Sequence, residues 1–180
     1  DKNAQDAISL IQTAEGSMSE IESMLQRMRE LTVQAANDTN ATTDRIKIAN
    51  EITQLTEEIT DMSKRTEFNE KVLTSGKFSA DALFFQIGAN KDQKITLTIQ
   101  NLSSTSLGVH SVASSIITHA PSASGGSNIS NLIKTVDDAV KAVSEERAKL
   151  GAKQNRLEYT SNNLQVSSEN LSSAKSRIED

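Results

Sequence analysis

The sequence has no cysteine, no tryptophan and one proline, and aromatic residues make up only 3% of its 180 residues. Without cysteine there is neither a disulfide framework nor a thiolate metal site. Hydrophobic residues make up only 36% of the chain, too few to fill the thick core of a compact sandwich or a doubly wound enzyme. This composition suits long helices that bury narrow rows of small and aliphatic side chains, in a chain of single-domain size.

Clustered positive charge and long apolar runs are also lacking. The formal net charge is −5, which argues against the basic face that nucleic-acid binding requires. No apolar run approaches the roughly 20 residues of a membrane span, and no signal peptide opens the chain. Because the sequence starts in a helical pattern without Met, we interpret it as a fragment. Neither nucleic acid nor membrane is an expected partner.

Two amphipathic helices are predicted in the N-terminal part. The first spans about residues 4–36, with apolar residues spaced alternately by three and four, a heptad-like pattern. The second begins after residues 42–44, which offer good N-cap side chains. A short connection between them favours antiparallel neighbours. The predicted apolar row of the second helix is Ile46, Ala49, Ile52, Leu55, Ile59 and Met62.

A β-hairpin is predicted after these helices. Leu83, Phe85 and Ile87 alternate with other positions, although Phe84 breaks strict alternation, and Ile95-Thr96-Leu97-Thr98-Ile99 alternates cleanly. The turn would lie in residues 88–92. Because an isolated hairpin is marginal in water, we expect it to lie on the helices.

Residues 102–127 differ in composition, since eleven of these 26 residues are Ser or Thr. We interpret the segment as an irregular linker or the remnant of an inserted region. A continuous helix of about 50 residues is predicted after it, packed along the first two helices. Its signal is one apolar residue every seven positions: Ile129, Val136, Val143, Leu150, Leu157, Leu164, Leu171 and Ile178.

The expected fold is therefore mainly α. It is an elongated antiparallel helical bundle or coiled coil of two N-terminal helices and one long C-terminal helix, with a β-hairpin packed on it. We divide the chain into residues 1–101, with the N-terminal helices and hairpin, the linker 102–127, and residues 128–180, whose long helix completes the same core domain.

No catalytic constellation is found, and neither an enzyme nor a cofactor is expected. The only histidines, His110 and His119, lie in the linker and suit solvated positions better than metal ligation. There is no phosphate-binding loop and no nucleophile elbow. Adjacent acids such as Glu145-Glu146 do not face each other on a helix, so they are interpreted as solvated surface.

Eight stretches of the sequence are informative when taken together. They are Asp6-Ala7-Ile8-Ser9, Thr13-Ala14-Glu15-Gly16, residues 25–37 (LQRMRELTVQAAN), Thr66-Glu67-Phe68-Asn69, residues 85–90 (FQIGAN), Leu107-Gly108-Val109, residues 147–157 (RAKLGAKQNRL) and residues 169–180 (ENLSSAKSRIED). In this order, and over nearly the whole chain outside 102–127, they resemble bacterial flagellin.

Glu70 is one departure from the family pattern. The family usually has glycine after Asn69, and a glycine adopts positive φ easily. The local turn is therefore expected to differ, or Asn69 to take that conformation.

The resemblance implies a structural subunit of the bacterial flagellar filament, exported from the cell and located in the extracellular flagellum. It also implies terminal segments before Asp1 and after Asp180 that form the polymerisation coiled coil. The implied partners are other flagellin subunits and, through those terminal segments, an export chaperone and a cap protein.

The resemblance further implies recognition by Toll-like receptor 5, the flagellin receptor of animal hosts. The bacterial use of the same surface would be packing between filament subunits. The principal receptor contacts carried over are Arg27, Leu31 and Glu51, with Gln26, Gln34, Ile48 and Arg147 nearby.

Three other classes of protein are alternatives to a flagellin. A hook–filament junction protein shares the helical character, but residues 25–37 favour flagellin. A coiled-coil signalling module, such as a chemoreceptor hairpin, would lack the strand at residues 95–99. An enzyme inserted in the variable region would need more than the 26 residues of the linker.

Overall fold

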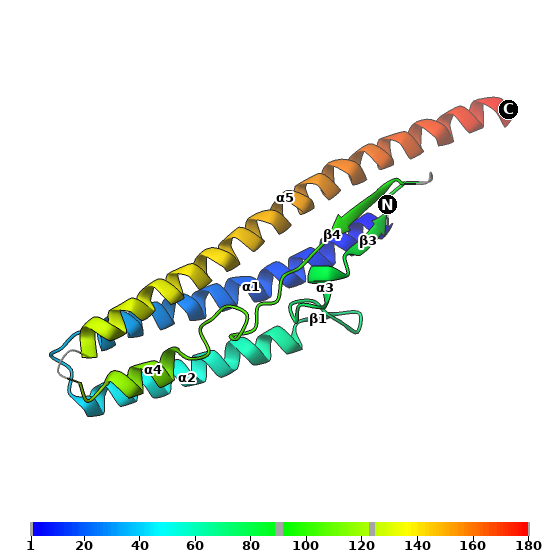
Figure 1. Cartoon of the computed structure of the whole chain (residues 1–180). Coiled ribbons are helices and arrows are strands. Elements are labelled where there is room, and N and C mark those ends of the chain that lie inside the picture. The colour runs from blue at the N-terminus through cyan, green and yellow to red at the C-terminus, as the bar shows by residue number, and fades with distance from the viewer. Residues whose placement is uncertain (1, 89–91, 123–124, 180) are drawn as a thin grey trace.

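The computed structural model describes residues 2–88, 92–122 and 125–179 and has an elongated shape built around two long helices (Figure 1). α1 (Lys2–Ala35) lies along α5 (Gly125–Glu179) over most of its length. α2 (Thr42–Arg65) returns antiparallel along α1. The C-terminal part of α5 extends beyond the other elements (Figure 1). The mainly α architecture predicted from periodicity is confirmed.

α1 is the central element, because it contacts α5, α2, β1 and β3. Its heptad-like row is almost completely removed from solvent, as predicted. The buried residues of α1 are Ala4, Ala7, Leu10, Ile11, Ala14, Met18, Ile21, Leu25, Met28, Leu31, Thr32 and Ala35.

α5 confirms the prediction of one continuous helix and spans 55 residues. The seven-residue row is buried at Ile129, Val136, Val143, Leu150 and Leu157, and Leu164 is half-buried. The side chains of Leu171 and Ile178 lie outside the described part of the chain. α5 packs on α1 and, near its start, on α4 (Val112–His119), which also packs on α2. The expected packing along both N-terminal helices is thus corrected: α5 lies mainly on α1, and α4 connects it to α2.

α2 differs from the prediction at its first turn. Ile46 is 38% exposed, while Ile48 and the charged Arg45 are buried, so the inward row begins at 45 and 48. The predicted N-cap is also wrong: the helix begins at Thr42, and the cap position is Ala41, which makes no side-chain cap bond. From Ala49 onward the predicted row faces the core.

Two small antiparallel hairpins follow α2. β1 (Glu67–Phe68) pairs with β2 (Lys71–Val72). After the single turn of α3 (Lys77–Ala80), β3 (Leu83–Gln86) pairs with β4 (Lys94–Leu97). The second hairpin is the predicted one, and Ile95, Leu97 and Ile99 are buried. Its predicted turn falls largely on residues 89–91, outside the described residues.

The loop of the first hairpin shows which backbone conformation Asn69 and Glu70 adopt. Both loop residues have positive φ, 49° at Asn69 and 62° at Glu70. A two-residue hairpin loop with positive φ at both positions is the type I′ geometry that matches the twist of the strands. Asn tolerates this region well, whereas Glu does not. Asn69 therefore takes positive φ, as one of the two expectations states, and Glu70 occupies the second positive-φ position although Glu is unfavourable there.

Residues 102–127 are not irregular throughout, which corrects that expectation. Residues 112–119 form α4, and 125–127 already belong to α5. His119 ends α4 instead of lying in a solvated loop. The segment also adds to the core through Leu102, Val109, Val112, Ala113, Ile116 and Ala120. Whether it replaces a variable region in the family stays a prediction.

Candidate functional site

The residues carried over from the flagellin resemblance centre on an ion pair between α1 and α2. The Arg27 Nη2 and Glu51 Oε1 atoms are 2.8 Å apart, and Arg27 Nε donates to the same oxygen at 2.9 Å. Arg27 Nη1 also donates to Glu30 at 3.2 Å. The hydrogen bond with Glu51, followed by that with Glu30, raises the pKa of Arg27 above its ordinary value. About half of each side chain of the Arg27–Glu51 pair stays exposed, so the pair is accessible to a protein partner.

Two other residues of the carried-over set belong to the core instead, and two are exposed. Leu31 is 2% exposed and Ile48 is 7% exposed. Gln26 and Gln34 are exposed on α1. The exposed members of the set are therefore polar or charged, and Leu31 and Ile48 lie in the core.

Arg147 lies on α5 and ties that helix to α1. Its guanidinium donates to Glu22, and its Nη2 lies 4.0 Å from Glu15. The side chain is 32% exposed. Arg147 is thus a bridge between the two long helices, with only part of its surface available to a partner.

A buried carboxylate corrects the interpretation of the paired acids as solvated surface. Glu146 on α5 is 3% exposed. One of its oxygens accepts from the backbone N–H of Gln100 at 3.1 Å, and the other accepts from Lys149 at 3.2 Å. The residue fastens the segment after β4 to α5, a contact that spacing within a single helix does not reveal.

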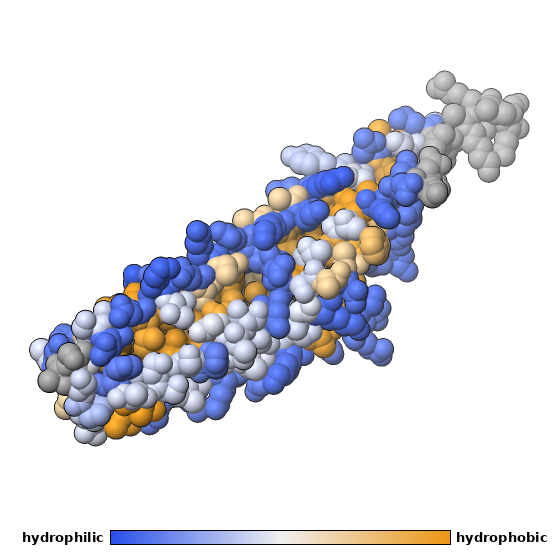
Figure 2. Space-filling model, in the orientation of Figure 1, coloured by the Kyte–Doolittle hydropathy of each residue, from blue (hydrophilic) through white to orange (hydrophobic). Residues whose placement is uncertain are grey.

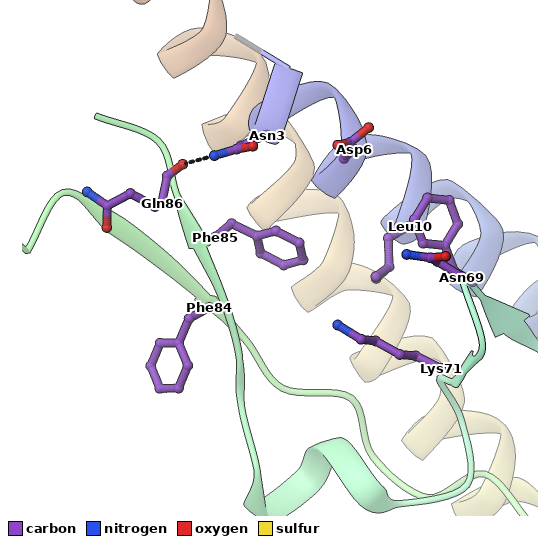
Figure 3. Close-up of a pocket in the computed structure, with 9 residues that line it drawn as sticks. Asn3, Asp6, Leu10, Asn69, Lys71, Phe84, Phe85 and Gln86 are labelled. Atoms are coloured by element: carbon purple, nitrogen blue, oxygen red, sulfur yellow. Dashed lines mark hydrogen bonds between the residues drawn. The ribbon is translucent and has the colours of Figure 1, made fainter. Parts of the chain in front are cut away.

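Sequence reasoning also missed a pocket of about 580 Å³ beside the N-terminal end of α1. Phe84 and Phe85 leave β3 on opposite sides, with Phe85 toward Leu10 and Phe84 turned outward (Figure 3). Phe84 is 63% exposed, and Lys94 lies 5.0 Å from its ring centre. The only available signal was the irregular alternation at Phe84. The pocket is lined by Asn3, Asp6, Leu10, Phe68, Asn69, Lys71, Phe84, Phe85 and Gln86.

Hydrophobic residues appear in patches between hydrophilic ones on the face that Figure 2 shows. In the described ranges, no set of three or more His, Cys, Asp or Glu residues is arranged to hold a metal ion. No helix in the described part of the chain combines the length and apolar character needed to cross a membrane.

Comparison with known proteins matches both ends of the chain to one family. Residues 1–79 match the model of the bacterial flagellin N-terminal helical region, and residues 133–180 match that of the C-terminal helical region. The chain is 46% identical over 202 residues to the flagellin of Bacillus subtilis strain 168, an alignment that covers 99% of this chain and 66% of the relative. The chain thus spans just under two thirds of that relative's length.

Solved structures agree with this assignment. The crystal structure of Bacillus cereus flagellin is similar with a TM-score of 0.71 and 28% identity, covering 90% of this chain and 88% of that one. A hook-associated protein structure from Vibrio parahaemolyticus has a TM-score of 0.78 at 13% identity, covering 98% and 88%, a likeness of fold alone. Because both family regions match in the expected order and pack against each other as α1 and α5, the chain belongs to the bacterial flagellin family.

Proposed function

We propose that this protein is a structural subunit of the bacterial flagellar filament, and so serves motility outside the cell. The observation that carries the proposal is the packing of α1 on α5, which unites the two flagellin regions in one rod-like bundle. Flagellins are structural proteins and not enzymes. A filament needs a rigid subunit with contacts at several surfaces, and the long bundle suits that requirement.

The flagellin resemblance also indicates binding partners, and the principal partners would be other flagellin subunits. An export chaperone and a cap protein would act through the terminal segments that the family uses for its polymerisation coiled coil. The hook–filament junction alternative is supported only by a likeness of fold, and the coiled-coil signalling alternative is disfavoured by the β3–β4 hairpin.

A chimera tests the filament proposal. Residues 1–180 would replace the matching segment of the Bacillus subtilis flagellin in a strain that lacks its own flagellin. We expect extracellular filaments in electron micrographs and restored swimming. A matched control chimera with Val143→Asp, a charge in the buried row of α5, should be exported less or not polymerise. A chimera that is folded and exported but forms no filaments would contradict the proposal.

A second proposal is that the protein is a ligand of Toll-like receptor 5. It is supported by one specific observation, the half-exposed Arg27–Glu51 pair on the α1–α2 face. A planar guanidinium held by a neighbouring carboxylate is preorganised for an interface contact. In this proposal Arg27 and Glu51 contact the receptor with Gln26 and Gln34 beside them. Leu31 and Ile48 then act by supporting that surface from the core.

A further inference from the structure

One buried guanidinium connects helix ends that are far apart in the sequence. Arg45, in the first turn of α2, is 3% exposed. Its Nε donates to the carbonyl of Ala35 at 3.0 Å, at the end of α1. Its Nη1 donates to the carbonyl of Ala120 at 3.2 Å, just after α4. Its Nη2 donates to the carbonyl of Asn37 at 3.3 Å and to Oδ1 of Asp38 at 2.8 Å.

Asp38 extends these contacts to the start of α5. The same Oδ1 atom accepts from the backbone N–H of Gly126 at 3.0 Å. The first N–H groups of a helix have no partner within the helix, and a carboxylate there is favoured by both hydrogen bonding and the helix dipole. Asp38 thus caps a helix that begins almost 90 residues later in the chain. A side chain at Gly126 would overlap the carbonyl of Ala36, so this approach requires glycine.

We propose that Arg45 and Asp38 form an acid-released clamp that holds the ends of α1, α4 and α5 together at one end of the bundle. Protonation of Asp38 removes the anionic partner of the buried Arg45 and weakens the acceptor that caps α5. A buried guanidinium without its counter-charge is costly. The release is therefore a local opening of α4 and the first turns of α5, while the middle of the bundle stays closed.

The electrostatics of the clamp set the pH at which it opens. The hydrogen bond from Arg45, and then that from the Gly126 N–H, lower the pKa of Asp38 below its ordinary value of 3.8. Because the folded-state pKa lies below the unfolded one, the stabilisation is fully present above the ordinary value. It is lost as the pH falls through the lower, folded-state value.

Other titratable groups at this end of the bundle are distinct from the clamp. Asp44 pairs with Lys47 at 3.3 Å on the exposed side of α2. His119 ends α4, with its Nδ1 atom 2.7 Å from the carbonyl oxygen of Ser115. Substituting Asp44 and His119 separately from Asp38 therefore shows which group is responsible for any opening at low pH.

Amide hydrogen exchange between pH 7 and pH 3, corrected for intrinsic rates, tests the clamp. In the wild-type protein we expect protection over residues 112–122 and 125–130 to fall by roughly 2- to 30-fold below pH 4, the range that loss of a helix N-cap produces. Protection over residues 143–157 should remain. Asp38→Asn keeps an oxygen acceptor but does not titrate, so its protection over 112–122 and 125–130 should be independent of pH.

Three control variants make the result decisive. Asp44→Asn and His119→Gln should respond to acid as the wild type does. Arg45→Lys keeps the charge but lacks the planar fork with five donors, so protection over 112–122 and 125–130 should be reduced already at pH 7. An unchanged acid response in Asp38→Asn would overturn the proposal. So would an acid response that disappears in His119→Gln, or equal loss of protection over 143–157.

Discussion

The guanidinium of Arg27 on α1 and the carboxylate of Glu51 on α2 form an ion pair across two antiparallel helices, with the Nη2 and Oε1 atoms 2.8 Å apart. Leu31, one turn further along α1, is 2% exposed. Four-residue spacing places Arg27 and Leu31 near each other on the helix, yet one is on the surface and the other in the core. Substitutions at the two positions should therefore act on receptor binding by different routes.

Arg27→Ala should weaken binding to the receptor ectodomain at least several-fold and leave the fold intact, because exposed ion pairs contribute little to stability. Leu31→Ala should destabilise the protein by about 2–5 kcal/mol, so any loss of binding should accompany local unfolding. Binding titrations paired with urea unfolding separate the two effects. Arg29→Ala is a matched control, since Arg29 forms an equally exposed pair with Asp137. Wild-type affinity in Arg27→Ala would contradict the proposed site.

The seven-residue apolar row of α5 predicts that substitutions in the row destabilise the protein more than substitutions beside it. Leu150 and Leu157 are 1% and 0% exposed, so replacing either by Ala should cost about 2–5 kcal/mol. Ser161→Ala and Ser168→Ala should be nearly neutral, because Ser161 is only half-buried and Ser168 is exposed. Urea unfolding monitored by circular dichroism measures the change in unfolding free energy for the two Leu variants and the two Ser variants. Similar costs in the two pairs would mean that the row has been assigned to the wrong face.

Periodicity was sufficient to predict α1, α5 and β4, because each buries a regular row of apolar side chains. It failed at the first turn of α2, where Arg45 occupies an inward position that an apolar residue would normally mark. The burial of Arg45 depends on Ala120 and Asp38, and no pattern within α2 contains that information. Glu146 is missed for the same reason, since its partner N–H belongs to Gln100.

The candidate site was also predicted only in part, because several of its features depend on contacts between separate elements. The flagellin resemblance named Arg27 and Glu51 together, whereas the antiparallel pairing of the first two helices is compatible with their contact but does not fix the register that creates it. The burial of Ile48 was not predicted, because the apolar row of α2 was assigned through Ile46. α4 is only eight residues long, too short for its three buried residues to establish a period among the serines. The pocket near Phe84 joins three separate segments, so its existence depends on tertiary packing alone.

The β1–β2 turn predicts a stabilising substitution. Glu70 has φ of 62°, a conformation that costs an ordinary L-residue roughly 1–2 kcal/mol and glycine much less. Glu70→Gly should therefore raise the free energy of unfolding by about 0.5–1 kcal/mol, after the greater entropy of glycine in the unfolded chain is deducted. Urea unfolding measures the change. Glu67→Gly is the control: Glu67 lies in β1 without positive φ, so glycine there should destabilise.

Replacing three helical glycines by alanine should change the stability of the protein, in one direction at two positions and in the opposite direction at the third. An added Cβ at Gly16 on α1 or at Gly151 on α5 meets no atom within 4 Å. Since alanine is favoured over glycine within a helix by about 0.5–1 kcal/mol, Gly16→Ala and Gly151→Ala should each stabilise the protein by up to that amount. At Gly126 the added Cβ would overlap the carbonyl of Ala36 and lie 2.5 Å from Oδ1 of Asp38. The start of α5 would have to move, and the cap from Asp38 would be strained.

We therefore expect Gly126→Ala to destabilise the protein by roughly 1–3 kcal/mol, despite its better helix propensity. Thermal or urea unfolding of the three single variants gives the sign of each stability change directly, and hydrogen exchange should locate the Gly126→Ala effect in residues 112–122 and 125–130. Stabilisation by Gly126→Ala would mean that α5 does not begin against Ala36 and Asp38. Destabilisation by Gly16→Ala would instead mean that the exposed face of α1 at residue 16 is in contact with another part of the protein.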